Sequence, residues 1–187
     1  TVHISRKGEK HNIDDNTTLV YQNENMQKVI EKVNQANEIS RPVLITGETG
    51  TGKELIAKMI KNTKDLKDST FIAVNCAAVP HTLWEEELFG HIKGSCTDAG
   101  ISRFGKIAQT GVGTLFFDEV GEIPIDIQAK LLRLLQEKQY MQIGGNKIIQ
   151  ADCRFVFATN QDIEKMVAEG KFREDLYYRI SVFHIHL

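Results

Sequence analysis

A glycine-rich segment, GETGTGKE at residues 47–54, has the residue types of a loop that holds phosphate. It follows the apolar run Val43–Ile45, an expected buried strand, and we expect a helix from Lys53 to Asn62. Glycines let the backbone turn its N–H groups toward phosphate oxygens, and the lysine reaches the outer phosphates. The predicted nucleotide-binding residues are Gly47, Glu48, Thr49, Gly50, Thr51, Gly52, Lys53 and Glu54.

Glu54 departs from the general pattern of such loops, because it occupies the position where serine or threonine usually holds Mg²⁺. A carboxylate is not a simple substitute for that hydroxyl. A bound metal is therefore expected to depend more on water and on an acidic residue elsewhere in the chain.

Two carboxylates follow a second apolar run, TLFFDE at residues 114–119. Asp118 would end a buried strand, where it suits Mg²⁺, and Glu119 is placed to polarise an attacking water as a general base. Adjacent acidic residues that serve metal and water separately indicate hydrolysis rather than transfer to a second substrate. This pair alone is a weak signal, and the upstream glycine-rich loop makes it a strong one.

Apolar periodicity predicts strands and helices in alternation, which favours a three-layer α/β domain with a mostly parallel sheet. Residues 1–20 are polar and are expected to form a linker or approach segment. The expected helices are 26–36, 53–62, 83–88, 104–109, 124–137 and 162–169, and the expected strands are 43–45, 71–74, 114–117, 140–143, 147–151, 154–158 and 182–186. The strands at 140–143 and 147–151 would form a hairpin around Gly144 and Gly145.

The composition is that of one globular domain. In 187 residues, 41% are hydrophobic and 26% charged, which excludes disordered, collagen-like and coiled-coil chains. The net charge of −2 argues against a polybasic nucleic-acid surface. Cys76, Cys96 and Cys153 lack zinc-ligand spacing, and their sparse, odd number suits a reducing cytosol. With no apolar run near 18 residues, we expect a cytoplasmic protein without membrane contact.

Six stretches together resemble the central AAA+ domain of bacterial enhancer-binding proteins, the NtrC-type activators of sigma-54 RNA polymerase. They are GETGTGKE at 47–54, FIAVNCAA at 71–78, ELFGH at 87–91, GTLFFDEVGEIP at 113–124, QAKLLRLLQE at 128–137 and FREDLYYRI at 172–180. Glu54 fits this family's pattern. The resemblance implies that residues 21–187 are a P-loop NTPase core that hydrolyses ATP with Mg²⁺. It also implies that the family's helical lid is missing after Leu187, so this chain alone should be a weak ATPase.

The resemblance also implies roles for single residues. Asn75 matches the switch asparagine that hydrogen-bonds the catalytic Glu119, and Asn160 matches the sensor of the γ-phosphate and attacking water. Arg173 and Arg179 match arginine fingers that a neighbouring subunit inserts into the ATP site. On the residues alone, these arginines suit a solvated helix face paired with acidic neighbours, and the surrounding match favours the fingers.

The family's sigma-54 contact loop, Gly-Ala-Phe-Thr-Gly-Ala, is altered at residues 94–99. The loop here consists of Gly94, Ser95, Cys96, Thr97, Asp98 and Ala99. A thiol offers much less apolar contact area than a phenyl ring, and Asp98 adds charge where glycine adds backbone freedom. The loop could engage sigma-54 weakly or with compensation, could have lost that contact, or could carry a drifted or engineered change. Cys96 could also act as a redox sensor, but an inert loop thiol is the favoured interpretation.

The leading hypothesis is a transcription regulator that assembles into a hexameric or heptameric ring of itself and remodels sigma-54 RNA polymerase through loop 94–99. A family relative that has lost the sigma-54 contact is the alternative. A P-loop kinase or GTPase is disfavoured because no Asn-Lys-x-Asp motif is present. DNA contact through a helix-turn-helix domain, and the sensed signal, would belong to parts outside this chain.

Overall fold

A five-stranded sheet in which all neighbouring strands are parallel forms the centre of the fold. The computed structural model describes residues 9–14, 17–21, 24–60, 70–94 and 101–187. The strands are β3 (Val43–Thr46), β4 (Phe71–Asn75), β7 (Thr114–Asp118), β10 (Arg154–Thr159) and β11 (Phe183–His186), in the spatial order β11-β3-β10-β7-β4. The expected α/β class with a parallel sheet is confirmed.

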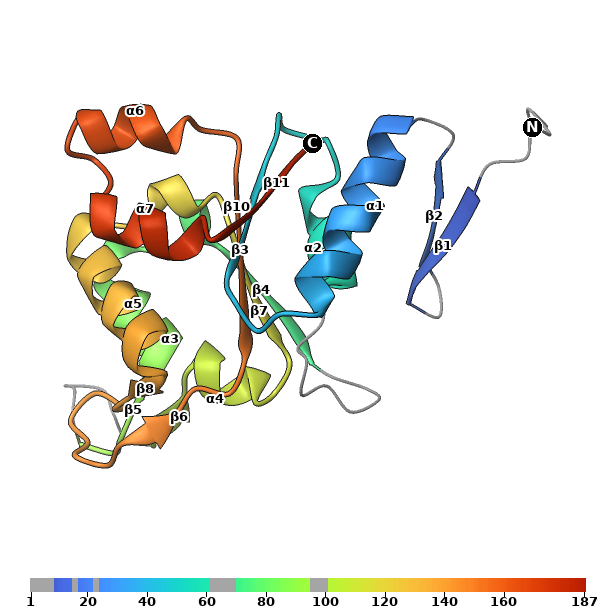
Figure 1. Cartoon of the computed structure of the whole chain (residues 1–187). Coiled ribbons are helices and arrows are strands. Elements are labelled where there is room, and N and C mark those ends of the chain that lie inside the picture. The colour runs from blue at the N-terminus through green and yellow to red at the C-terminus, as the bar shows by residue number, and fades with distance from the viewer. Residues whose placement is uncertain (1–8, 15–16, 22–23, 61–69, 95–100) are drawn as a thin grey trace.

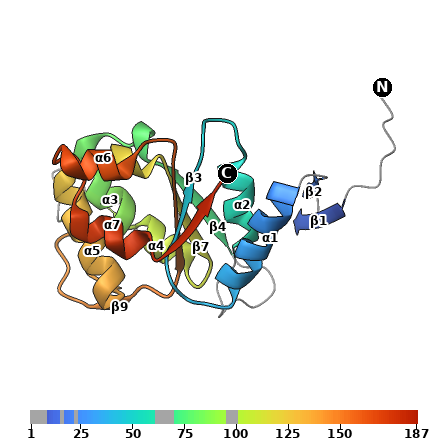
Figure 2. The same ribbon diagram turned by 45° about the horizontal axis from the view of Figure 1, so that its top comes forward.

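Helices cover both faces of the sheet and complete three layers (Figure 1). One face carries α1 (Glu24–Asn37) and α2 (Lys53–Met59), and the rotated view shows the remaining helices on the other face (Figure 2). These are α3 (Trp84–Phe89), α4 (Lys106–Thr110), α5 (Ile125–Glu137), α6 (Ile163–Ala168) and α7 (Glu174–Ile180). Three short 3₁₀ turns lie at Cys76–Ala78, His81–Leu83 and Val120–Glu122.

Side-chain alternation along β10 divides the core into two clusters. Phe155 and Phe157 pack with the residues of α5 and α7, whereas Val156 and Ala158 pack with those of α1 and α2. Phe157 stacks on Phe117 of β7 with ring centroids 5.2 Å apart. A central parallel strand is covered on both faces, which explains why β10 reads as an uninterrupted buried run.

Buried Arg154 attaches the start of β10 to the end of α1. Its guanidinium donates to the carbonyl of Ala36 at 2.9 Å and also to that of Ile39. Burial lowers the pKa of Arg154 to about 10. The Ala36 carbonyl, which also accepts from the Ile39 N–H at 3.3 Å, and the Ile39 carbonyl just beyond α1 are thereby held beside the start of β10.

The residues expected to be a linker or approach segment contain β1 (Glu9–Asp14) and β2 (Thr17–Tyr21), an antiparallel pair outside the central sheet. Two expectations need correction. The expected hairpin has only the two-residue strands β8 (Gln139–Tyr140) and β9 (Ile149–Gln150). Phe104 belongs not to α4 but to β6 (Arg103–Phe104), which pairs with β5 (Gly90–His91).

Two features of the prediction lie outside the described residues: loop residues 95–99, and the end of the helix expected to reach Asn62. Within the part of the chain that is described, no helix is both long and apolar enough to cross a membrane.

Candidate nucleotide-binding site

The glycine-rich loop connects β3 to α2 at the carboxyl edge of the sheet, as the sequence predicts. Gly50 and Gly52 have φ angles of 84° and 88°, a left-handed conformation that glycine adopts without steric cost. Thr51 closes the turn, since its backbone N–H and its hydroxyl both donate to the Glu48 carbonyl, at 3.3 and 2.8 Å. The loop therefore has the curled backbone that a phosphate group requires.

Lys53 is buried at the first position of α2, with 7% of its surface exposed. Its ammonium donates to the carbonyls of Gly47 and Glu48, both at 3.0 Å. An ammonium has three donors, so one remains for a phosphate oxygen as far as the described residues show. A positive charge enclosed by the loop backbone is the arrangement that binds a polyphosphate.

Asp118 and Glu119 lie at the carboxyl end of β7. The Asp118 carboxylate accepts from the backbone N–H of Glu119 at 3.1 Å. Glu119 has φ 54° and ψ 54°, a left-handed conformation that costs a non-glycine residue about 1–2 kcal/mol. A conformation of this cost is typical of a residue whose side chain is held for chemistry rather than for packing.

Asn160 connects the glycine-rich loop to Glu119. Its side-chain amide donates to the Thr49 hydroxyl at 2.9 Å, and its backbone N–H donates to the Glu119 carboxylate at 3.4 Å. Asn160 follows β10, which lies between β3 and β7 in the sheet. The strand order therefore brings together three predicted site residues. In the sequence, Asn160 is 111 positions from Thr49 and 41 positions from Glu119.

Asn75 and Glu54 lie near these residues but make other contacts. Asn75 is beside Asp118 in the register of β4 and β7, and its side-chain oxygen accepts from the Ala77 N–H at 3.1 Å. The described hydrogen bonds do not include one between Asn75 and Glu119, so the switch role stays a prediction. Glu54 pairs with Lys58 at 3.1 Å along the surface of α2. Asp118 is the better candidate for a metal ligand.

The residues fit a magnesium ion of the kind that accompanies nucleotides. Mg²⁺ usually takes one or two carboxylates and completes its shell with water and phosphate oxygens. The Asp118 carboxylate uses one oxygen for the Glu119 N–H. Among the described residues, no group of three His, Cys, Asp or Glu side chains could hold a metal unaided.

Arg173 is the N-cap residue of α7 and makes two contacts: the pairing with an acidic neighbour that the residues alone suggested, and one with Gln128 that they did not reveal. Its guanidinium forms a two-pronged pair with Asp175, at 3.0 and 2.6 Å, and this pair raises the pKa of Arg173 and lowers that of Asp175. Its backbone N–H donates to the side chain of Gln128 at 2.8 Å. Arg173 is thus a half-exposed cation on a fixed backbone.

Arg179, the second predicted arginine finger, is directed at its own chain. Its guanidinium donates at 2.9 Å to the carbonyl of Leu135, near the end of α5. The Nε of Arg179 is buried and has no hydrogen-bond partner among the described residues. A role in another subunit's site would require this contact to break.

Gln128 is the fully buried residue that attaches the Arg173 segment to α5. Its amide donates to the carbonyls of Ile123 and Lys171, at 2.8 and 3.2 Å, and its oxygen accepts from the Arg173 N–H. The fully buried Gln128 side chain thus hydrogen-bonds three backbone groups.

Replacing Gln128 with leucine should lower the free energy of unfolding by about 3 kcal/mol, because three backbone groups lose their partner. Urea denaturation followed by circular dichroism would measure the loss. Gln109→Leu is the matched control: it removes one exposed hydrogen bond, to the Phe104 carbonyl at 2.6 Å, and should cost less than about 1 kcal/mol. Equal losses in both variants would contradict the structural role of Gln128.

A cavity of about 500 Å³ lies away from these residues, between α3, α5 and the β8–β9 segment. Phe89, Leu134 and Tyr140 are among its apolar lining residues, and none of residues 47–54 lines it. It is therefore separate from the candidate nucleotide site.

The fold and this site define a P-loop domain of the AAA+ class. NtrX from Brucella abortus, in a crystal structure described as a complex with ATP, superposes with a TM-score of 0.76 and 32% identity over 90% of this chain and 38% of NtrX. Hsp104 shares the fold alone, with a TM-score of 0.61 and 21% identity over 87% of this chain and 33% of its own.

The chain belongs to the Sigma-54 interaction domain family, which it matches over residues 19–186. The formate hydrogenlyase transcriptional activator FhlA of Escherichia coli is 47% identical over 90% of this chain and 24% of FhlA. The Nif-specific regulatory protein of Azospirillum brasilense is 50% identical over 87% of this chain and 26% of that protein. The expected family is confirmed, and the chain spans about a quarter of the length of these relatives.

Proposed function

We propose that this domain hydrolyses ATP, and the position of Asn160 between Thr49 and Glu119 is the observation that carries the proposal. Lys53 binds the phosphates, and Asp118 holds the magnesium ion that accompanies them. When bound, Mg²⁺ supplies positive charge that offsets the charge developing on the phosphates. Glu119 accepts a proton from the attacking water, and Asn160 keeps the Glu119 carboxylate aligned with the phosphate loop.

Hydrolysis would depend on assembly into a hexameric or heptameric ring. Arg173 is half-exposed and its backbone is held by Gln128, which suits a cation presented to a neighbouring copy. An arginine supplied in trans stabilises charge on the transferred phosphate. Arg179 would contribute after releasing the Leu135 carbonyl. A turnover rate per subunit that rises with protein concentration would support this; a constant rate would contradict it.

The ring would use ATP hydrolysis to remodel sigma-54 RNA polymerase through loop 94–99, in the cytoplasm. Membership of the Sigma-54 interaction domain family and the transcriptional activators among its relatives support this role. DNA contact would come from a helix-turn-helix domain outside this chain. ATP-dependent open-complex formation at a sigma-54 promoter in vitro tests the role, and failure with an active ATPase would contradict it.

The alternative is a regulator of the same family that has lost the sigma-54 contact. Cys96 stands where the family has its aromatic residue, and Asp98 replaces its second glycine. Such a protein would still hydrolyse ATP and assemble, but it would act on transcription by another contact.

Restoring the family residues, Cys96→Phe with Asp98→Gly, should strengthen sigma-54 binding about tenfold. A buried phenyl ring adds apolar contact worth about 1–2 kcal/mol more than a thiol. The measurement is capture of sigma-54 in the presence of ADP and aluminium fluoride, with ADP alone as the control state. No gain from the double variant would contradict an impaired contact at these two positions.

A further inference from the structure

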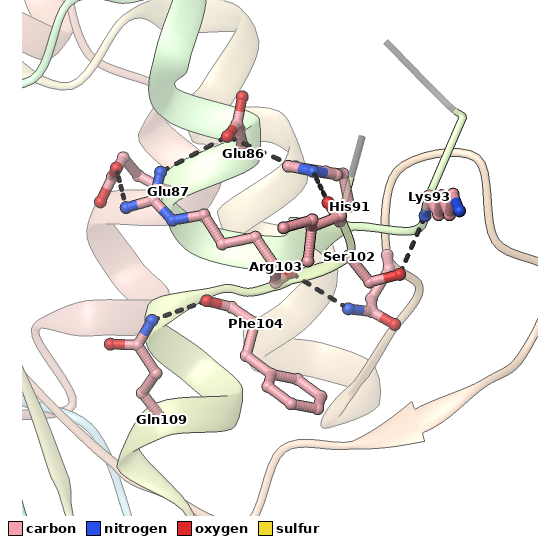
Figure 3. A network of polar contacts seen from close by, with 10 residues as sticks. Glu86, Glu87, His91, Lys93, Ser102, Arg103, Phe104 and Gln109 are labelled. Carbon is pink, nitrogen blue, oxygen red and sulfur yellow. Dashed lines mark hydrogen bonds and ion pairs between the residues drawn. The ribbon is translucent and has the colours of Figure 1, made fainter. Parts of the chain in front are cut away.

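The strands β5 and β6, which precede and follow loop 94–99 in the sequence, form a two-stranded stem. Gly90 lies opposite Phe104 and His91 opposite Arg103 in an antiparallel register. Gly90 has a φ of 72°, and a Cβ there would lie 2.2 Å from the Arg103 carbonyl oxygen. The two strands are therefore pressed together at the base of the loop (Figure 3).

Arg103 attaches one strand of this stem to α3. Its guanidinium lies 2.8 Å from the Glu87 carboxylate and 3.4 Å from that of Glu86 (Figure 3). The two carboxylate side chains are 23% and 26% exposed, so water screens them less than it would screen fully exposed groups. A planar guanidinium has donors on several edges and can contact both carboxylates at once. The compact ammonium of a lysine is less suited to such a double contact.

His91, on the other strand, lies beside the Glu86 carboxylate without a hydrogen bond to it among the described residues. Its Nδ1 lies 3.3 Å from Glu86, and its Nε2 lies 2.9 Å from the carbonyl oxygen of Ile101, across the stem. Glu86 therefore contacts both strands, through Arg103 on one and His91 on the other.

The segment between β8 and β9 holds the stem from a second side. Ile143 donates its N–H to the Gly90 carbonyl at 2.9 Å, and its carbonyl accepts from the Ile92 N–H at 3.2 Å. The Gln142 side chain donates to the Arg103 carbonyl at 3.4 Å. The amides of Ile92 and Ile143 thus report whether the β5 side of the stem stays attached to this segment.

We propose that Arg103, acting through Glu86 and Glu87, is a positioning residue that fixes the base of loop 94–99 to α3 and so determines how well the loop binds its partner. This inference rests on the proposed function, in which that partner is sigma-54. A contact loop whose base is already ordered loses less conformational freedom on binding, so its affinity is higher. The charge contacts at the stem supply this order without touching the nucleotide site.

Hydrogen exchange in the intact chain tests the stem directly. Arg103→Ala should accelerate exchange at the Ile92 and Ile143 amides about fivefold, the effect of losing one partly exposed charge network. Arg103→Lys should restore slow exchange in part, and combining Arg103→Glu with Glu87→Arg should restore it more than either reversal alone. The control is Lys130→Ala, which removes an ion pair with Glu85 on the same helix but outside the stem.

Sigma-54 capture and ATP turnover complete the test. We expect Arg103→Ala to weaken capture with ADP and aluminium fluoride about fivefold, and to leave kcat and KM for ATP unchanged. If wild-type protein captures no sigma-54, the proposed partner is wrong, while accelerated exchange still supports the stem assignment. Unchanged exchange in Arg103→Ala, or an equal change in Lys130→Ala, would overturn the inference. Lost capture without faster exchange would also overturn it, by making Arg103 a direct contact.

Discussion

ATP affinity should fall about 100-fold when Lys53 is replaced by alanine. The buried ammonium is a charged donor inside the phosphate loop, and such a hydrogen bond contributes up to about 3 kcal/mol. Removing it also takes away the ammonium that the Gly47 and Glu48 carbonyls accept from. Isothermal titration calorimetry with ATP and Mg²⁺ would measure the loss.

Lys58→Ala is the matched control for that variant. Lys58 lies on the same helix, has a half-exposed side chain, and pairs with Glu54 on the surface of α2 rather than with the carbonyls of Gly47 and Glu48. Its removal should change ATP affinity less than about threefold, in line with the small contribution of surface ion pairs. ATP binding by Lys53→Ala that equals binding by Lys58→Ala would show that the nucleotide binds elsewhere.

ATP hydrolysis should fall by about 10²–10⁴-fold in Glu119→Gln, while nucleotide affinity stays nearly unchanged. That range is the usual contribution of a general base. The amide retains an oxygen that can accept from the Asn160 N–H, so the local geometry is preserved while the capacity to take a proton is lost. Phosphate release under saturating ATP, with calorimetry on the same sample, separates the two effects.

Glu122→Gln controls for the loss of a nearby charge. Glu122 belongs to the 3₁₀ turn that follows Glu119, and it accepts from the Gln161 side chain at 2.6 Å. Turnover in this variant should remain within about threefold of wild type. Equal losses in the two variants would argue for an electrostatic effect of the acidic segment rather than proton transfer to Glu119.

The sequence was most informative where function depends on neighbours along the chain. The loop at 47–54 is contiguous, and the runs Val43–Ile45 and Thr114–Phe117 are short, apolar and bounded by turn residues. Their prediction therefore needed no knowledge of distant contacts.

Residues with distant partners escaped prediction from residue patterns. Gln128 contacts backbone groups 5, 43 and 45 positions away, so no local pattern marks it as the anchor of Arg173. The hairpin at 140–151 was expected to pair with itself around Gly144 and Gly145. Its strands are shorter because Ile143 pairs instead with Gly90 and Ile92 of the loop stem.

The packing of β10 also has a chemical consequence. Its large and small residues alternate, with Phe155 and Phe157 toward α5 and Val156 and Ala158 toward α1. Sliding this strand by one position would exchange the two sets, forcing phenyl rings into the space of methyl groups. The same slip would carry Asn160 away from Thr49 and Glu119. Steric selection in the hydrophobic interior thereby protects the alignment of polar groups at the sheet edge.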